Sequence, residues 1–451
     1  MTSNANDLTA TIPADPALAD QLMADLAQLV AIPSIGALSR HRDDLARSAR
    51  LVAALARAAG ATAEVVDQVA APAVLAHWPG PEGSPTVCLY AHHDVQPVGD
   101  PALWRTDPFQ TVLVGERVFG RGTADDKGAI ALHLACLRAW GGRPPVGVKL
   151  FVEGEEEIGS PNLAAFLERH RQQLAADVFV VADSGNWAVG QPGLTVALRG
   201  VTGCVVELRT LDHGVHSGQF GGVVPDAWTA LIRLLASLHQ ADGAVAVAGL
   251  ESGLKFEAQH DEARFRAEAG VLESVALIGR GSIADRLWAG PAITVIGLDA
   301  VGVAEASNTL APVARANISL RVPPTVDATA AQDRLIEHLR AHVPWGAELT
   351  ITRSVCGAPA LIGLDSPAAR RAVQAWGEVF GTPPVPMGQG GSIPMVNGLA
   401  EAFPGSTIIA SAVCDPDSRM HAPDESVHLG DLVRQVRAQS RFLELLGEDA
   451  D

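Results

Sequence analysis

Residues Thr86 to Asp94 read TVCLYAHHD, a short uncharged run that ends in three ionisable side chains. A run of this length without a charge is typical of a strand buried on both faces, as in a parallel sheet. Two similar runs follow along the chain, at 146–152 and 177–182. We therefore expect three buried parallel strands, and polar side chains close to the ends of them.

Between these strands, apolar residues recur at three- and four-residue spacing, which predicts helices that alternate with the strands. Ser160 is expected to cap the helix that follows the second strand, with Pro161 in its first turn. The alternation predicts an α/β fold with a mostly parallel sheet and right-handed crossovers. The helices expected in this half of the chain cover 16–31, 43–59, 128–140 and 161–174.

The pattern changes after residue 193, where shorter runs with period-two alternation predict antiparallel strands. Two helices, 225–240 and about 328–342, lie among these strands. Alternating strand and helix sequence returns at Ser366, a good N-cap before a first-turn proline. We expect an α/β domain formed by residues 1–193 and 361–451, into which residues 194–360 insert a separate α+β domain.

Composition excludes several classes of partner. The 451 residues carry 33 Lys and Arg against 51 Asp and Glu, a formal charge of −18. Nucleic acids and anionic membranes require a basic face, so neither is an expected partner. No run approaches the ~20 apolar residues of a membrane helix. The acidity itself has two possible meanings at this point: a soluble surface, or carboxylates gathered around a cation.

The cysteines and the N-terminal sequence bear on location. The chain has five cysteines, an odd number without a Cys-x-x-Cys pair, so neither a disulfide framework nor a thiolate zinc site is expected. Residues 1–15 contain no basic start and no apolar run, so no signal peptide is expected. We expect buried thiols in a cytoplasmic protein.

Ionisable residues follow the predicted α/β strands, and ligands of open α/β sheets bind at the carboxyl ends of the strands. Any one of these residues is more readily explained as a structural or surface group, but those explanations do not predict that all should meet. Crowded carboxylates need a cation, and imidazoles beside oxygens suit zinc, manganese or cobalt. The inventory fits two metals ~3.5–4 Å apart. The segments are His92-His93-Asp94, 153–157, Asp183, His421, and Asp125-Asp126 before the 128–140 helix.

Four motifs in order along the chain give a resemblance to a known family. They closely resemble the M20 family of di-metal peptidases, especially its dipeptidase branch, which includes the carnosine dipeptidases. The resemblance implies a catalytic α/β domain and an inserted lid domain through which such proteins usually dimerise, so a homodimer is expected. The motifs are YAHHDVQP (90–97), GRGTADDKG (120–128), EGEEEIGS (153–160) and HSG (216–218).

The resemblance also implies roles for individual residues in hydrolysis. Glu156 would be the general base, taking a proton from a water that bridges the two metals and returning it to the leaving amine. Asp94, two residues beyond His92 in an extended segment, would hold a ligand in orientation. Zinc is expected, although manganese and cobalt accept the same ligands. The implied ligands are His92 and Asp183 for one metal, Glu157 and His421 for the other, and Asp125 for both.

Five further residues match substrate-binding positions of the family. His216 matches a histidine that reaches the active site of the neighbouring subunit and stabilises the oxyanion. Arg321 matches the arginine that binds the substrate's terminal carboxylate, a task that suits a planar bidentate donor. Thr309, Gly391 and Ser392 match other substrate-binding positions.

The sequence departs from the family pattern at two places. Ala91 replaces the usual glycine before the first histidine, a small change. Gly388-Gln389 stands where dipeptidases of this type commonly carry Arg-Glu, which alters the wall near the substrate. This change concerns the substrate specificity and not the metal ligands.

Three functional hypotheses follow. The first is a two-metal dipeptidase for small peptides with a free terminal carboxylate. The second is an N-acyl-amino-acid amidohydrolase with the same metals and base. The third is a non-catalytic metal-binding or scaffold protein, which the presence of Glu156 and of all five implied ligands argues against.

Overall fold

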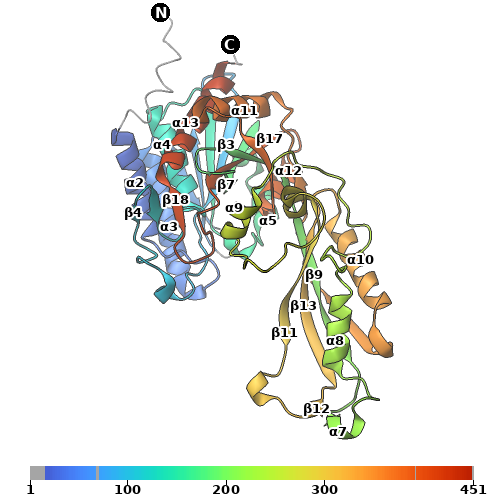
Figure 1. The fold of residues 1–451 in the computed structure, drawn as a ribbon. Helices are drawn as coiled ribbons and strands as arrows, with labels where there is room; N and C mark the ends of the chain where they lie inside the picture. Colours follow the sequence, from blue (N-terminus) through green and yellow to red (C-terminus); the bar gives the residue numbers. More distant parts are fainter. Residues whose placement is uncertain (1–15, 68–70, 392, 449–451) are drawn as a thin grey trace, which may run out of the picture. The chain divides into compact units, whose positions relative to one another are not determined.

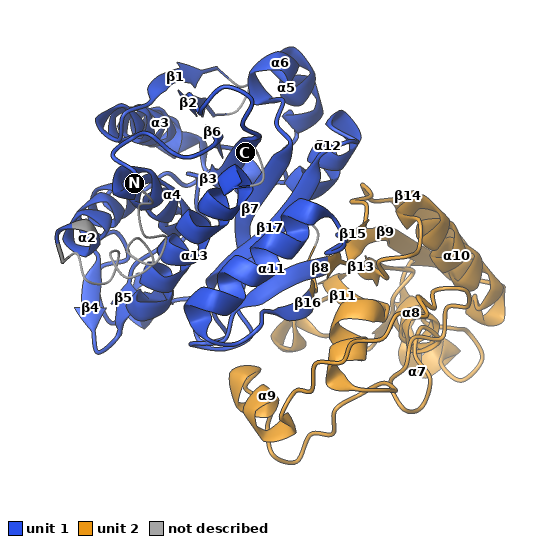
Figure 2. Ribbon diagram, turned by 90° about the horizontal axis from the view of Figure 1, so that it is seen from above, with its two compact units in different colours: residues 1–196, 362–387, 394–451 blue, residues 197–361, 388–393 orange. Residues whose placement is uncertain are grey.

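The computed structural model describes residues 16–67, 71–391 and 393–448. The chain divides into two compact units (Figure 2): unit 1 comprises 1–196, 362–387 and 394–451, and unit 2 comprises 197–361 and 388–393. The sequence suggested boundaries after 193 and 360, and it grouped residues 388–393 with the last α/β stretch. In the structure that short segment belongs to unit 2.

A sheet forms the centre of unit 1 (Figure 1). Strand β3 pairs in parallel with β6 and β7, and β17 pairs in parallel with β7, which confirms the predicted mostly parallel core of the sheet. Strands β1, β2 and β8 add antiparallel pairs at the two sides. The order is β1 (Thr62–Val66), β2 (Ala73–Trp78), β6 (Gly147–Glu153), β3 (Thr86–His92), β7 (Val178–Gly185), β17 (Thr407–Cys414) and β8 (Gly193–Leu198).

Helices cover both faces of this sheet, which is why its central strands are mostly apolar. Along β3, Leu89 and Ala91 belong to the large core on the face of α4 and α13. Tyr90 points to the opposite face, where its ring lies 5.6 Å from that of Phe151, which in turn stacks on Phe166 of α5 at 5.1 Å. Figure 2 shows the two helical layers. They contain α3 (Arg42–Ala58), α4 (Lys127–Ala139), α11 (Pro367–Phe380) and α13 (Leu429–Glu448) on one face, and α5 (Leu163–Arg169), α6 (Arg171–Leu174) and α12 (Pro394–Ala402) on the other.

The helix predicted at 161–174 is the clearest error in this unit. It begins at Leu163 and breaks at His170 into α5 and α6. Ser160 cannot cap it, because its φ of 50° is left-handed, whereas an N-cap residue is normally extended. Asn162 precedes the helix instead, and its side-chain amide donates to Glu155 Oε2 at 2.7 Å.

Unit 2 is an antiparallel sheet with helices on one face. Alternate residues of β9, including Cys204, Val206 and Leu208, form a core with α8 and α10, as the period-two pattern requires. Asp226 caps α8 by accepting from the backbone N–H of Thr229 at 2.9 Å. The sheet order is β11 (Ala292–Asp299), β13 (Val313–Val322), β9 (Gly200–Arg209) and β14 (Glu348–Arg353), with α8 at Ala227–Ala236 and α10 at Ala328–Ala341.

Four of the five cysteines are buried and all five are free thiols, whereas Cys356 is only half-buried, contrary to the expectation. None of the helices in the described ranges combines the length and the apolarity that crossing a bilayer would require. Residues 1–15, for which no signal peptide was expected, lie outside the described residues.

Candidate metal centre

Three of the candidate ligands come from neighbouring parallel strands. His92 is the last residue of β3, Asp183 lies near the end of β7, and Glu157 lies in the 3-10 turn Glu156–Ile158 that follows β6. Since β6, β3 and β7 are adjacent and parallel, their carboxyl ends meet at one edge of the sheet. The topology therefore gathers ionisable residues there, as in other open α/β sheets.

The other two ligands come from loops that a small sheet brings together. Asp125 precedes α4, and His421 lies between β17 and β18 (Ser426–His428). Strand β18 pairs with β5 (Arg117–Phe119), placing Ser426 opposite Phe119. His421 has a φ of 62°, a left-handed conformation that is uncommon for a residue other than glycine.

Asp125 lies at the centre of the cluster. Its Oδ1 is 3.0 Å from His92 Nε2, and its Oδ2 is 2.9 Å from His421 Nε2. Asp183 Oδ1 lies 3.9 Å from His92 Nε2, and Glu157 Oε2 lies 3.4 Å from His421 Nε2. The five side chains thus form two groups that share one carboxylate, and each of its oxygens serves a different group.

Burial and mutual charge set the protonation of these groups. Burial opposes the charge of His92, but hydrogen bonds to Asp125 and Asp94 outweigh it and raise the pKa of this imidazole. Burial also acts to raise the pKa of Asp125, but hydrogen bonds from His421 and His92 hold it well below its usual range. Burial and the charge of Asp125 raise the pKa of Glu157 to about 8. The cluster concentrates negative charge that needs compensation by protons or cations.

The geometry fits metal binding. In each of two sets, His92, Asp125 and Asp183, and Asp125, Glu157 and His421, one ligand atom per residue lies within 4.8 Å of the others. Ligands about 2.0–2.1 Å from a tetrahedral metal lie about 3.3 Å from one another, close to the separations found here. Each set supplies three nitrogen and oxygen donors, the number typical of a catalytic zinc site with an open position.

Asp94 contacts one residue of each ligand group. Its Oδ1 lies 3.5 Å from His92 Nδ1, and its Oδ2 accepts from the backbone N–H of Glu157 at 3.0 Å. A side chain at Gly36 would place its Cβ 2.7 Å from Asp94 Oδ2, so glycine is needed there. Gln96 donates to Glu157 Oε2 at 2.7 Å. The orientation of both groups therefore depends on buried hydrogen bonds.

Glu425 is a supporting residue that we did not predict from sequence. Its Oε1 accepts from the backbone N–H groups of Ala124 and Asp125 at 3.0 and 3.1 Å, and its Oε2 accepts from that of Gly122 at 3.0 Å. The guanidinium of Arg121 donates to the same Oε2 at 2.6 Å, and both side chains are buried. Glu425 therefore holds the Asp125 loop against the loop that carries His421. Its position four residues after His421 was the only local signal.

Removing the partner of this buried carboxylate should destabilise unit 1. In Arg121→Met, Glu425 keeps its backbone donors but loses its counter-charge, and breaking a buried ion pair costs about 3–5 kcal/mol. Urea unfolding should show a loss of that order. The control is Arg105→Met, because Arg105 is 72% exposed in its pair with Asp424, and such pairs contribute about 0–1 kcal/mol. Equal losses in the two variants would contradict this account.

The remaining candidates lie in unit 2. His216 in β10 (Val215–His216) is paired with Thr309 in β12 (Thr309–Leu310), and both are exposed. Arg321 lies near the end of β13 and is half-buried. Gly391 lies in the segment that joins unit 2, and Ser392 lies outside the described residues. None of the four described residues is in the unit that contains the ligand cluster.

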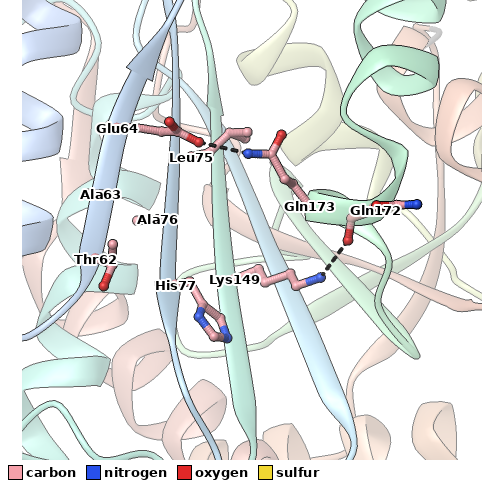
Figure 3. A pocket seen from close by; sticks show the side chains of 9 residues that line it. All are labelled: Thr62, Ala63, Glu64, Leu75, Ala76, His77, Lys149, Gln172 and Gln173. Atoms are coloured by element: carbon pink, nitrogen blue, oxygen red, sulfur yellow. Dashed lines mark hydrogen bonds between the residues drawn. The ribbon is translucent and has the colours of Figure 1, made fainter.

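A separate hollow in unit 1 contains none of the predicted residues. It has a volume of about 420 Å³ and lies among β1, β2, β6 and α6 (Figure 3). Lys149 there donates to the carbonyl of Ala175 at 2.6 Å, and Gln173 donates to Glu64 at 2.9 Å. Both of these side chains are thus already bonded to protein groups, and the ligand cluster, not this hollow, is the candidate site.

Comparison with known proteins identifies the family. Residues 88–445 match the family model described as Peptidase family M20/M25/M40. The chain is 36% identical over 372 residues to the cysteinylglycine-S-conjugate dipeptidase of Corynebacterium striatum, covering 81% of this chain and 82% of that protein. It is 25% identical over 457 residues to the human Beta-Ala-His dipeptidase, covering 94% and 89% of the two chains. The crystal structure of human carnosine dipeptidase 1 has a similar fold, with a TM-score of 0.83, 23% identity and 99% of both chains covered. The chain therefore belongs to peptidase family M20/M25/M40, the family that its motifs predicted.

Proposed function

We propose that this peptidase hydrolyses the amide bond of dipeptides or other small peptides with the help of two divalent metal ions. The observation that carries the proposal is the carboxylate of Asp125, whose two oxygens each bond to a histidine of a different ligand group. Two relatives are a cysteinylglycine-S-conjugate dipeptidase and a Beta-Ala-His dipeptidase, which supports the substrate class.

The five clustered side chains would hold the metals. His92 and Asp183 would bind one ion, Glu157 and His421 the other, and Asp125 both. Divalent metals bound there would lower the pKa of a water toward ~7 and stabilise charge on the substrate carbonyl. Zinc is our proposal for the ion, since its donor preference fits this set, and manganese and cobalt share that preference.

Glu156 is proposed as the general base. It lies beside Glu157 in the 3-10 turn, and within the described residues its carboxylate has no hydrogen-bond partner, so it is free to accept a proton. Burial raises its pKa, and the charges of Asp125 and Asp94 add to that effect against those of the two histidines. A carboxylate with a raised pKa is suited to take a proton from water and pass it to the leaving amine. Asp94 would act as a positioning residue through His92 and Glu157.

His216 is proposed to donate to the developing oxyanion of a neighbouring subunit. Its Nδ1 accepts from the backbone N–H of Gly218 at 3.0 Å, so in the neutral ring the proton must be on Nε2. That nitrogen is then a donor, as stabilisation of an oxyanion requires. Arg321 is proposed to bind the substrate's terminal carboxylate, and Thr309, Gly391 and Ser392 to line the substrate.

Replacement of His216 tests this role. His216→Ala should lower kcat about 10²- to 10³-fold, because one oxyanion donor is lost, with metal content unchanged. The matched control is His213→Ala, an exposed histidine paired only with Asp212, which should leave kcat unchanged. Loss of metal from the His216 variant would contradict the assignment.

A homodimer formed through unit 2 is part of the proposal, because His216 would act on the partner's substrate. Strand β11 is an edge strand of the unit 2 sheet and exposes Ile296 and Leu298 at 62% and 55%. Exposed apolar edge strands are normally covered in stable proteins, which supports a second copy on this side. The buried free thiols support a reducing compartment such as the cytoplasm.

A substrate panel tests the reaction. We expect kcat/KM for dipeptides to exceed that for N-acetyl and N-succinyl amino acids by about tenfold or more. Polar groups of a pocket that binds a free amine would be left without partners when an acyl group occupies the pocket. Preference for the acylated compounds would replace the dipeptidase proposal by that of an N-acyl-amino-acid amidohydrolase.

A further inference from the structure

Two arginines lie close together at one end of the unit 2 sheet. Arg321 of β13 is opposite Val201 of β9, and Arg199 directly precedes β9, two residues before Val201. Figure 1 shows β9 and β13 side by side. Residues in this diagonal relation lie on the same face, about 7–8 Å apart, within reach of long side chains. Arg199 donates from Nη1 to the carbonyl of Gly290 at 3.3 Å, toward β11, which also pairs with β13. This is the face that points away from the helices α8 and α10.

The two guanidinium groups lack a counter-charge. Arg199 is only 8% exposed, and its Nε is buried without a hydrogen-bond partner. Among the described residues, neither Arg199 nor Arg321 forms an ion pair with a carboxylate. Burial and the charge of Arg321 lower the pKa of Arg199 to about 10, which shows how unfavourable its charge is there. A buried guanidinium N–H without an acceptor would be stabilised by an anionic ligand that accepts from it.

The same face provides an internal comparison. Arg315, also on β13, lies 3.5 Å from Glu207 and 3.3 Å from Asp299, so its charge is compensated. The lack of a partner is thus particular to the Arg199–Arg321 end of the face. It is not a general property of arginines on this sheet.

The segment 388–390 forms a wall beside Arg199. The backbone N–H of Arg199 donates to the carbonyl of Gln389 at 3.2 Å, and a Cβ on Gly390 would lie 2.9 Å from Arg199 Nη2. A Cβ on Gly388 would lie 2.2 Å from that of Trp288, which accounts for glycine at this departure from the family pattern. Glycine at 390 therefore avoids a close contact between a side chain of that residue and the guanidinium.

We propose that Arg199 and Arg321 together bind the terminal carboxylate of the substrate, with Arg199 as a second specificity-determining residue. The inference rests on the proposed function and deepens it. Guanidinium groups match carboxylates in a planar, bidentate geometry, and one carboxylate can accept from both groups. A neutral terminus would leave both charges uncompensated, so the pair selects substrates with a free carboxylate.

The test compares alanyl-glycine with alanyl-glycinamide. In Arg199→Gln, KM for alanyl-glycine should rise about 10- to 100-fold with little change in kcat, because one charged hydrogen-bonding group is lost. KM for the amide should be high in the wild type and unchanged in the variant. Arg199→Lys keeps the charge and should cause a smaller rise, and Arg315→Gln should change neither substrate. An unchanged KM for alanyl-glycine, or equal increases for both compounds, would overturn the proposal.

A binding experiment separates this proposal from the proposed function. Calorimetry with alanyl-glycine on the full-length Glu156→Gln protein needs no turnover. Adding Arg199→Gln should weaken binding about 10- to 100-fold, and equal binding would reject the role of Arg199. If the wild type hydrolyses no dipeptide although this binding depends on Arg199, only the proposed function fails. Thermal melting of each variant checks that it is folded.

Discussion

Asp125→Asn should cause the loss of both metal ions. The carboxylate places one oxygen near each histidine, at 3.0 and 2.9 Å, and an asparagine can offer only one oxygen to only one group. Its amide nitrogen is a donor and would be held against the other metal. We expect metal analysis after dialysis to show a large loss of bound ions, and dipeptide hydrolysis to fall by at least about 10³-fold, as when the activated water is no longer generated.

The comparison variant is His421→Ala, which removes a ligand from one group only. It should retain the ion that His92 and Asp183 would bind. The two variants should therefore differ in the number of metal ions bound per chain. If Asp125→Asn retained as much metal as the wild type, Asp125 would not be the shared ligand.

Glu156→Gln should abolish most of the activity without changing metal content. The variant has the same shape but cannot accept a proton, and general-base catalysis contributes about 10²- to 10⁴-fold to a rate. We expect kcat to fall within this range, and metal analysis to give the wild-type stoichiometry, because Glu156 belongs to neither ligand set.

The neighbouring residue provides a matched control. Glu155 accepts from the backbone N–H of Ala71 at 3.2 Å and from Asn162 at 2.7 Å, which ties the turn to the rest of unit 1. Glu155→Gln should therefore affect stability more than kcat. Full activity of the Glu156 variant would mean that another group accepts the proton.

Four central strands of the unit 1 sheet were predicted from their apolar runs. Strands β3, β6, β7 and β17 are apolar because helices cover both of their faces, so their runs are visible without any partner. Strand β1, whose residues are mostly exposed, was missed, and so was β2, although all of its residues except His77 are buried. The helix after residue 160 was predicted to be too long. Ser160 is a good capping residue by type, but its backbone is in a left-handed conformation, which the local sequence does not reveal.

For the candidate site, the sequence determined which side chains are available. His92, Asp183 and Glu157 follow buried strands, and the known tendency of parallel strands to end at one edge was enough to expect them together. The choice of nitrogen and oxygen donors likewise follows from residue types alone, and it limits the suitable metals. His421 was expected because it follows the last predicted strand, and Asp125 because it precedes the 128–140 helix, while the resemblance to the family implied their roles as ligands.

Only the tertiary structure decided which of those side chains, and which of their neighbours, contact one another. It gave each oxygen of Asp125 a different histidine, joined Glu425 to the loop of Asp125, and placed Arg199 beside Arg321 with no carboxylate of the described residues paired to it. The physical reason is the range of the interactions: strand burial and capping depend on residues a few positions apart, which the sequence displays directly. A hydrogen bond between residues 125 and 425, or an absent ion pair, depends on which distant segments pack together.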